Sequence, residues 1–173
     1  MTFEFRNLDE KTREIMLEEF NNDFNANNWY KSSRLSPVGV QEYPNLVKEA
    51  FLRGTIESLE ESIKPGIHLN TTETIHMKNG TVYQKSVPKD APRVMANEFN
   101  RYYVIAICKR AIAENKTVCY YRGRESSRHR EESNELIGAY ITDLEAHIGY
   151  LKDIQNVDNH IPKPNSGITV ELV

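Results

Sequence analysis

Apolar residues recur at helical spacing along the first part of the chain. Asp9 is a good N-cap residue, and Leu17, Phe20 and Phe24 follow it at i, i+3 and i+7. This pattern predicts a helix of about fifteen residues that buries one face. Five asparagines between residues 21 and 28 favour turns, because their side chains compete for backbone hydrogen bonds, so the helix is expected to end there.

Two shorter helices are predicted next. Residues 43–53 form the first, with Gly54 in the position just after the helix end that glycine favours. Thr55 is the expected N-cap of the second, over residues 56–63, and Pro65-Gly66 should stop it.

The pattern changes after residue 66, where threonine, valine, isoleucine and tyrosine surround the dipeptide Asn79-Gly80. Asn-Gly is a strong hairpin signal, because both central positions of a type I′ turn need a positive φ. We therefore predict antiparallel strands over residues 71–78 and 81–87.

The longest predicted helix covers residues 92–114 and carries two apolar stripes. One is Met95, Phe99, Tyr102 and Ala106, and the other is Ile105, Cys108 and Ile112. Two stripes indicate burial on more than one side, which predicts the central helix of the fold.

The last part of the chain mixes short elements. The prediction is a strand over 116–121, a helical turn over 131–137, a helix over 143–154, an extended surface chain over 156–167 and a final strand over 168–173. An unpaired apolar strand favours aggregation, so the final strand must pair with its own sheet or with a neighbouring subunit.

Together these elements predict an α+β fold, with several helices around a long central helix and a small antiparallel sheet that includes the Asn-Gly hairpin. The length of 173 residues suits one domain, with a helical part at 1–65 and an α+β part at 66–173 that has an extended C-terminal tail.

Composition narrows the function classes. The chain is 39% hydrophobic and 27% charged, which is typical of a globular protein, and its net charge of −3 gives no overall attraction to nucleic acid or acidic membranes. The N-terminus lacks a basic and apolar leader, and no apolar run is long enough to span a bilayer. We expect an intracellular, cytoplasmic protein without a membrane partner.

The most charged segment holds four arginines, Arg122, Arg124, Arg128 and Arg130, on a predicted loop. Guanidinium groups suit phosphate, so this loop is a candidate contact site for nucleic acid or a phosphorylated ligand. Four glutamates close by offset the charge, and only weak nucleic-acid binding is expected: Glu125, Glu131, Glu132 and Glu135. A salt-bridged surface or a subunit contact is the alternative.

Other chemistry has no visible motif. The five histidines are scattered without zinc-ligand spacing, and no phosphate-binding glycine motif or nucleophile elbow occurs. The sequence therefore predicts no metal, no cofactor and no catalytic residue.

Four segments resemble an uncharacterised family of small bacterial and phage or prophage proteins. They are residues 33–43, 97–112, 121–138 and 162–172. The resemblance implies a virion or head-assembly role and a location in the host cytoplasm or the virion, and it carries no established catalytic residues.

Three function classes follow. The first is a non-enzymatic phage-type structural or assembly protein, a homo-oligomer or a partner of other virion proteins, which acts by self-association or by docking on a protein shell. The second is a nucleic-acid or phosphorylated-ligand binder that uses the loop at 122–130. The third is an enzyme whose site is assembled from dispersed acids and histidines.

Overall fold

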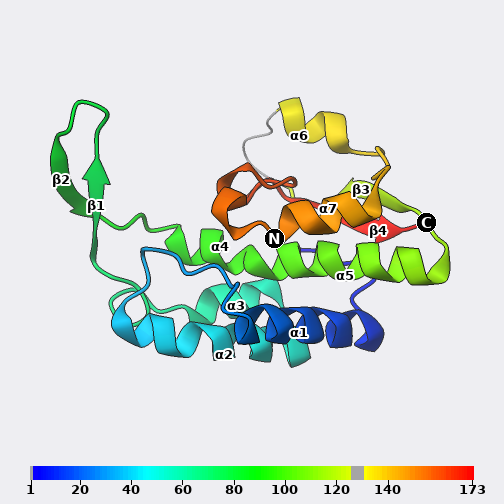
Figure 1. Ribbon diagram of the computed structural model, residues 1–173, viewed down its shortest axis with the longest axis horizontal. Coiled ribbons are helices and arrows are strands. Elements are labelled where there is room, and N and C mark those ends of the chain that lie inside the picture. Colours follow the sequence, from blue (N-terminus) through cyan, green and yellow to red (C-terminus); the bar gives the residue numbers. More distant parts are fainter. Residues whose placement is uncertain (1, 126–130) are drawn as a thin grey trace.

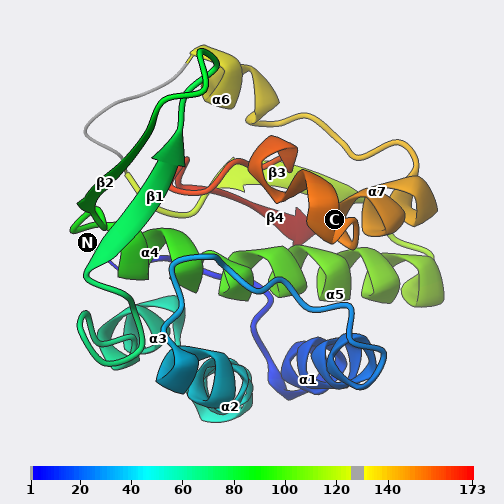
Figure 2. The same cartoon turned by 60° about the vertical axis from the view of Figure 1, so that its left-hand side comes forward.

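The computed structural model describes residues 2–125 and 131–173, and it has the predicted α+β fold. Helix α5 (Glu98–Glu114) lies in the middle of the molecule. In Figures 1 and 2, three helices lie on one side of it, and α7 and a two-stranded sheet lie on the other. These surrounding elements are α1 (Glu10–Asn25), α2 (Pro37–Arg53), α3 (Ile56–Ser62), α7 (Leu144–Leu151), β3 (Val118–Arg122) and β4 (Ile168–Leu172).

Helix α5 is surrounded by the fold, as its two apolar stripes predicted. Every residue from Glu98 to Cys108 is buried, including the charged residues Glu98 and Arg101. The predicted helix over 92–114 is divided in the structure, because Asn97 separates α5 from the short helix α4 (Ala91–Ala96).

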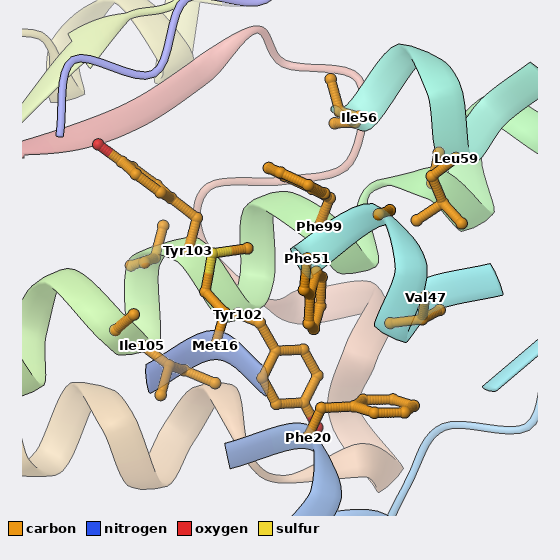
Figure 3. Packing of buried hydrophobic residues seen from close by; sticks show 14 of the residues in the cluster. Met16, Phe20, Val47, Phe51, Ile56, Leu59, Phe99, Tyr102, Tyr103 and Ile105 are labelled. Carbon is orange, nitrogen blue, oxygen red and sulfur yellow. The ribbon is translucent and has the colours of Figure 1, made fainter. Parts of the chain in front are cut away.

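Aromatic side chains fill the space between α5 and the N-terminal helices (Figure 3). The ring of Phe20 meets Tyr102 edge-on at a centroid distance of 5.4 Å, and it meets Phe51 at 5.9 Å. Phe51 in turn packs edge-on against Phe99 at 5.6 Å. Edge-to-face pairs of this kind stabilise a core beyond the area they bury, so these rings fix α1 and α2 against α5.

Helices α1 and α2 each begin directly after a residue whose side chain caps the helix. The Asp9 carboxylate accepts a hydrogen bond from the Thr12 amide, as expected for the start of α1. Helix α2 begins at Pro37, earlier than predicted, with Ser36 as its N-cap. The sequence prediction placed the start at Tyr43 and took Ser36-Pro37 as a turn, so both Tyr43 and Pro44 lie inside the helix. Local capping sets the earlier start, because the Ser36 hydroxyl accepts from the Gly39 amide at 3.0 Å and proline suits the first helical position.

The predicted hairpin is present as β1 (Thr72–His76) and β2 (Val82–Ser86), which pair antiparallel. Its turn differs from the predicted type I′. Only Gly80 has a positive φ, of 85°, and its amide donates to the Met77 carbonyl at 3.0 Å. Asn79 does not adopt the left-handed backbone conformation that a type I′ turn requires. Its side-chain oxygen accepts a hydrogen bond from the Thr81 amide.

The final strand β4 pairs antiparallel with β3 of the same chain, with Tyr120 opposite Val170. The sequence left open whether the final strand pairs with its own sheet or with a neighbouring subunit, and in the structure it pairs with its own sheet. The segment before it is more ordered than the predicted extended surface chain: it contains the 3-10 helix η1 (Ile154–Asn159), and His160 and Pro162 are buried. The remaining helix, α6 (Glu131–Leu136), ends before Gly138, which has a φ of 83°.

Candidate functional site

A cavity of about 260 Å³ opens beside the junction of α4 and α5. Most of its lining comes from residues 30–34, residues 94–104 of α4 and α5, and residues 157–164 of the C-terminal segment, and Tyr43, Glu73 and Leu151 complete it. Its position depends on the fold of that C-terminal segment, because this segment forms one wall.

A buried ion pair lies at the cavity. Arg101 Nε donates to Glu98 Oε1 at 2.5 Å, and Arg101 Nη1 donates to the Leu151 carbonyl at 2.5 Å. The third nitrogen, Nη2, lies beside the same glutamate oxygen but has no hydrogen-bond partner among the described residues. Burial raises the pKa of Glu98 above its usual value, and the Arg101 guanidinium opposes this shift. The pair thus holds both Nε and Nη2 of Arg101 against one oxygen of Glu98.

His160 is the second buried polar residue at the cavity. Its Nε2 lies 2.9 Å from the Asp153 carbonyl, and because a carbonyl can only accept, Nε2 carries the proton. Burial lowers the pKa of His160, and the positive charge of Arg101 lowers it further, so the ring is neutral at pH 7. The Tyr150 backbone acts weakly in the opposite direction and raises the pKa of the ring, and the buried Nδ1 makes no hydrogen bond of good geometry with the described residues.

The walls of the cavity combine apolar side chains with polar and charged ones, and the apolar part comes from both sides. The apolar part includes Val94, Met95, Val104, Leu151, Val157 and Pro162. Tyr43 lies among them, and its hydroxyl is already used, since it donates to the Met95 carbonyl at 3.0 Å. The Tyr43 hydroxyl is therefore already satisfied within the protein.

The charges around the cavity favour ligands that are not anionic. Arg34 and Glu73 form an ion pair at 2.7 Å, and Asp158 is exposed. With the Glu98–Arg101 pair, the lining holds three carboxylates and two guanidiniums. Burial raises the pKa of Tyr30, and so does the nearby charge of Asp158, which keeps the tyrosine hydroxyl neutral.

The predicted arginine loop is placed only in part. Arg124 is buried, with its guanidinium 5.2 Å from the centre of the Phe3 ring, and burial lowers its pKa. Arg122 donates to the Asn134 side chain at 2.5 Å. Arg128 and Arg130 lie outside the described residues. Both described arginines thus make contacts within the chain, and phosphate binding by this loop stays a prediction.

Metal and membrane sites are not found in the described residues. Across 2–125 and 131–173, no group of three or more metal-binding side chains converges. Within the same ranges, no helix is both long and apolar enough to cross a bilayer.

The sequence analysis missed the cavity. One signal was available, because Glu98 and Arg101 stand three residues apart in a helix predicted to be buried on several sides, and buried charges are rare unless they are paired. No comparable signal marked His160, since its burial depends on the folding of the segment after α7.

Comparisons with known proteins give no family for this chain: no family model matches it, and neither a curated protein nor a solved structure shows significant similarity to it.

Proposed function

We propose that the protein is a non-enzymatic assembly protein of the phage type, which acts by self-association or by docking on a larger protein shell. The observation that carries this proposal is the β1–β2 hairpin, which extends beyond the helices at one end of the molecule in Figure 1. The resemblance to small bacterial and phage or prophage proteins points to the same class.

The hairpin exposes apolar side chains away from the core of the monomer. Met77, Val82 and Tyr83 are 49%, 54% and 45% exposed. All five residues of β2 are exposed. A two-stranded hairpin is marginally stable in water by itself, and it gains stability when a further strand or a helix covers it. Docking on another subunit would supply that cover.

The hairpin also has the geometry for strand addition. It is a sheet of two strands, so β1 and β2 each have one edge without a paired strand. Such an edge presents free amide and carbonyl groups that can pair with a strand of another chain. The ion pair between Arg34 and Glu73 holds the base of the hairpin to the body, which gives the projecting part a defined direction.

The C-terminal strand is a less suitable contact than the sequence suggested. Because β4 pairs with β3 along its whole length, it is used within the monomer and would have to leave its own sheet to exchange. The hairpin requires no such rearrangement.

Substitution of the exposed apolar pair tests the proposal. We expect the wild-type protein to form an oligomer at about 100 µM, well below the millimolar range of accidental contacts. The double variant Val82→Lys/Tyr83→Lys should be a monomer, as measured by sedimentation velocity, with an unchanged far-ultraviolet circular dichroism spectrum.

Tyr140→Lys is the matched control, because Tyr140 is 54% exposed but lies far from the hairpin in sequence. It should leave the oligomeric state unchanged. A wild-type protein that is monomeric at this concentration, or a hairpin variant that associates like the wild type, would contradict self-association through the hairpin.

A further inference from the structure

A second pocket, of about 360 Å³, lies between α7 and β3. We propose that this aromatic pocket, lined by Tyr120, Tyr140, Asp143, His147 and Tyr150, binds a methylated ammonium group, as in choline or trimethyllysine. Among the described residues, it shares no lining side chain with the cavity beside α4 and α5 or with the β1–β2 hairpin. Ligand binding here is therefore independent of self-association through the hairpin.

Aromatic rings make up half of the pocket lining. Four of the eight lining residues are Tyr120, Tyr140, His147 and Tyr150. The described lining also holds one carboxylate, that of Asp143, and no lysine or arginine. Ring faces attract a cation through the ring quadrupole, and aromatic cages bind quaternary ammonium groups in this way. The composition thus favours an organic cation over an anion.

One wall of the aromatic pocket is a single face of α7. Asp143, His147 and Tyr150 stand at i, i+4 and i+7, and the His147 amide donates to the Asp143 carbonyl at 3.0 Å, so the three side chains follow one another along the helix. Asp143 is exposed, and Tyr150 is 36% exposed. Ile148 and Leu151, which belong to the core, lie on a different face of the helix. The Asp143 face can therefore contact a ligand without a change in the core.

The other wall comes from β3 and the segment that follows it. Tyr120 forms the buried part of this wall: its hydroxyl lies 3.4 Å from His147 Nε2, and the planes of the two rings are 83° apart. The backbone of Tyr140 forms an antiparallel bridge with β3, and its side chain is 54% exposed. Rings from two elements thus meet at a steep angle, which is the arrangement that surrounds a cation from more than one side.

The charge of the aromatic pocket is negative. Burial lowers the pKa of His147, and the charge of His160 lowers it further, so the imidazole is neutral at pH 7 and does not repel a cation. The Asp143 carboxylate caps α7 through one oxygen, which accepts from the Ala146 amide at 3.0 Å, and it forms no ion pair with the described residues. Its full negative charge exceeds the partial charge of about +0.5 at the helix start.

Proton NMR titration of the full-length protein tests this site. The compounds are tetramethylammonium, choline and Nα-acetyl-trimethyllysine amide, together with 3,3-dimethylbutanol, which is the uncharged carbon analogue of choline. We expect at least one ammonium compound to bind with a Kd below about 1 mM, and the uncharged analogue to bind at least about fivefold more weakly. The N-methyl resonance should move upfield on binding, because aromatic ring faces shield protons that lie over them.

The same titration distinguishes two sources of the ammonium group. Tighter binding of choline would identify a free small molecule, whereas tighter binding of the trimethyllysine compound would identify a modified side chain of another protein. Either result supports the proposed site.

Two variants locate the binding. Asp143→Asn removes the charge but keeps a good N-cap residue, so it should weaken binding of the ammonium compound by about fivefold without changing that of the uncharged analogue. Tyr140→Leu removes an exposed ring and should weaken the same binding by about threefold. Asp90→Asn is the control for charge, because Asp90 is exposed and lies outside the aromatic pocket, and its affinity should equal that of the wild type.

Three results would overturn the proposal, and the first two need no variant. They are a Kd above about 1 mM for every ammonium compound, equal binding of choline and its uncharged analogue, and wild-type affinity of Asp143→Asn for the ammonium compound. Circular dichroism of Asp143→Asn shows whether that variant is folded.

Discussion

Two clusters of charged side chains pack against α5, and they differ in how completely their hydrogen bonds are made. The Glu19 cluster consists of Glu19, Asp23, Lys109 and Lys152. One carboxylate oxygen of Glu19 contacts Lys109, and the other lies 2.5 Å from Lys152 Nζ. Although burial acts to raise the pKa of Glu19, the hydrogen bonds from both lysines hold it below its usual value.

Asp23 completes this cluster. One of its oxygens lies 3.1 Å from Lys152 Nζ, and the other accepts a hydrogen bond from the Tyr102 hydroxyl at 2.6 Å. All four carboxylate oxygens of the cluster are thus paired, and the cluster joins α1 to α5 and to the end of α7.

The Glu98 cluster, which consists of Glu98, Arg101 and His160, is more deeply buried but less complete. Within 2–125 and 131–173, Arg101 Nη2 contacts only the Glu98 carboxylate and makes no hydrogen bond of good geometry, and His160 Nδ1 makes none. A buried charge stabilises a fold only when its interactions repay the loss of water. The comparison indicates that the hydrogen bonds of the Glu19 cluster are complete, whereas the Glu98 cluster buries charge with incomplete hydrogen bonding.

The largest expected effect comes from breaking the buried ion pair of the Glu98 cluster. Arg101→Met should lower the free energy of unfolding by about 3–5 kcal/mol, because it leaves Glu98 buried without its cation. Replacing both partners, as Glu98→Leu/Arg101→Met, should recover most of this loss, since well-packed apolar residues often equal a buried pair in stability. Urea unfolding measures both values.

Arg53→Met is the control for the arginine substitution. Arg53 forms an exposed pair with Glu49 on α2, and its loss should cost less than about 0.5 kcal/mol. If the double variant is as unstable as Arg101→Met, the Glu98 cluster is needed for stability and the contrast between the clusters disappears.

A smaller loss is expected from the Glu19 cluster. Glu19→Gln should lower the free energy of unfolding by about 2 kcal/mol at pH 7, because two lysines lose a charged partner but Lys109, 41% exposed, can turn to water. Glu18→Gln, at an exposed position of the same helix, should be neutral. Equal stability of the two variants in urea would show that the Glu19 cluster contributes nothing.

The smallest effect is a dependence of stability on pH. Because the folded state lowers the pKa of His160, the unfolded chain binds a proton more readily, and stability is lost as the pH falls below the ordinary histidine pKa of about 6.5. The slope from this residue is at most about 1.4 kcal/mol per pH unit.

Urea unfolding at pH 7.5, 6.5 and 5.5 measures that slope. His160→Phe should show a shallower fall in stability than the wild type, whereas His76→Gln, on the exposed hairpin, should follow the wild type. The remaining slope of His160→Phe should include a contribution from His147, whose pKa is also lowered by burial and then by His160. Identical curves for all three proteins would contradict the assigned state of His160.

The sequence by itself determined the features that depend on local chemistry. Asp9 and Thr55 cap the helices that they were expected to cap, and Asn79-Gly80 lies in the hairpin turn. The two apolar stripes identified α5 as the central helix. Each of these features depends on residues a few positions apart, so the interactions that decide them are present in the local sequence.

Tertiary structure decided the rest, because distant segments compete for the same backbone and side-chain groups. Pairing with β3 used the edge of β4 that could have joined another subunit. The cavity exists because the segment around His160 folds against the start of α5, about sixty residues earlier in the chain. A histidine in a polar, proline-containing segment gives no local sign of burial, so its unpaired nitrogen becomes visible only when both segments are placed together.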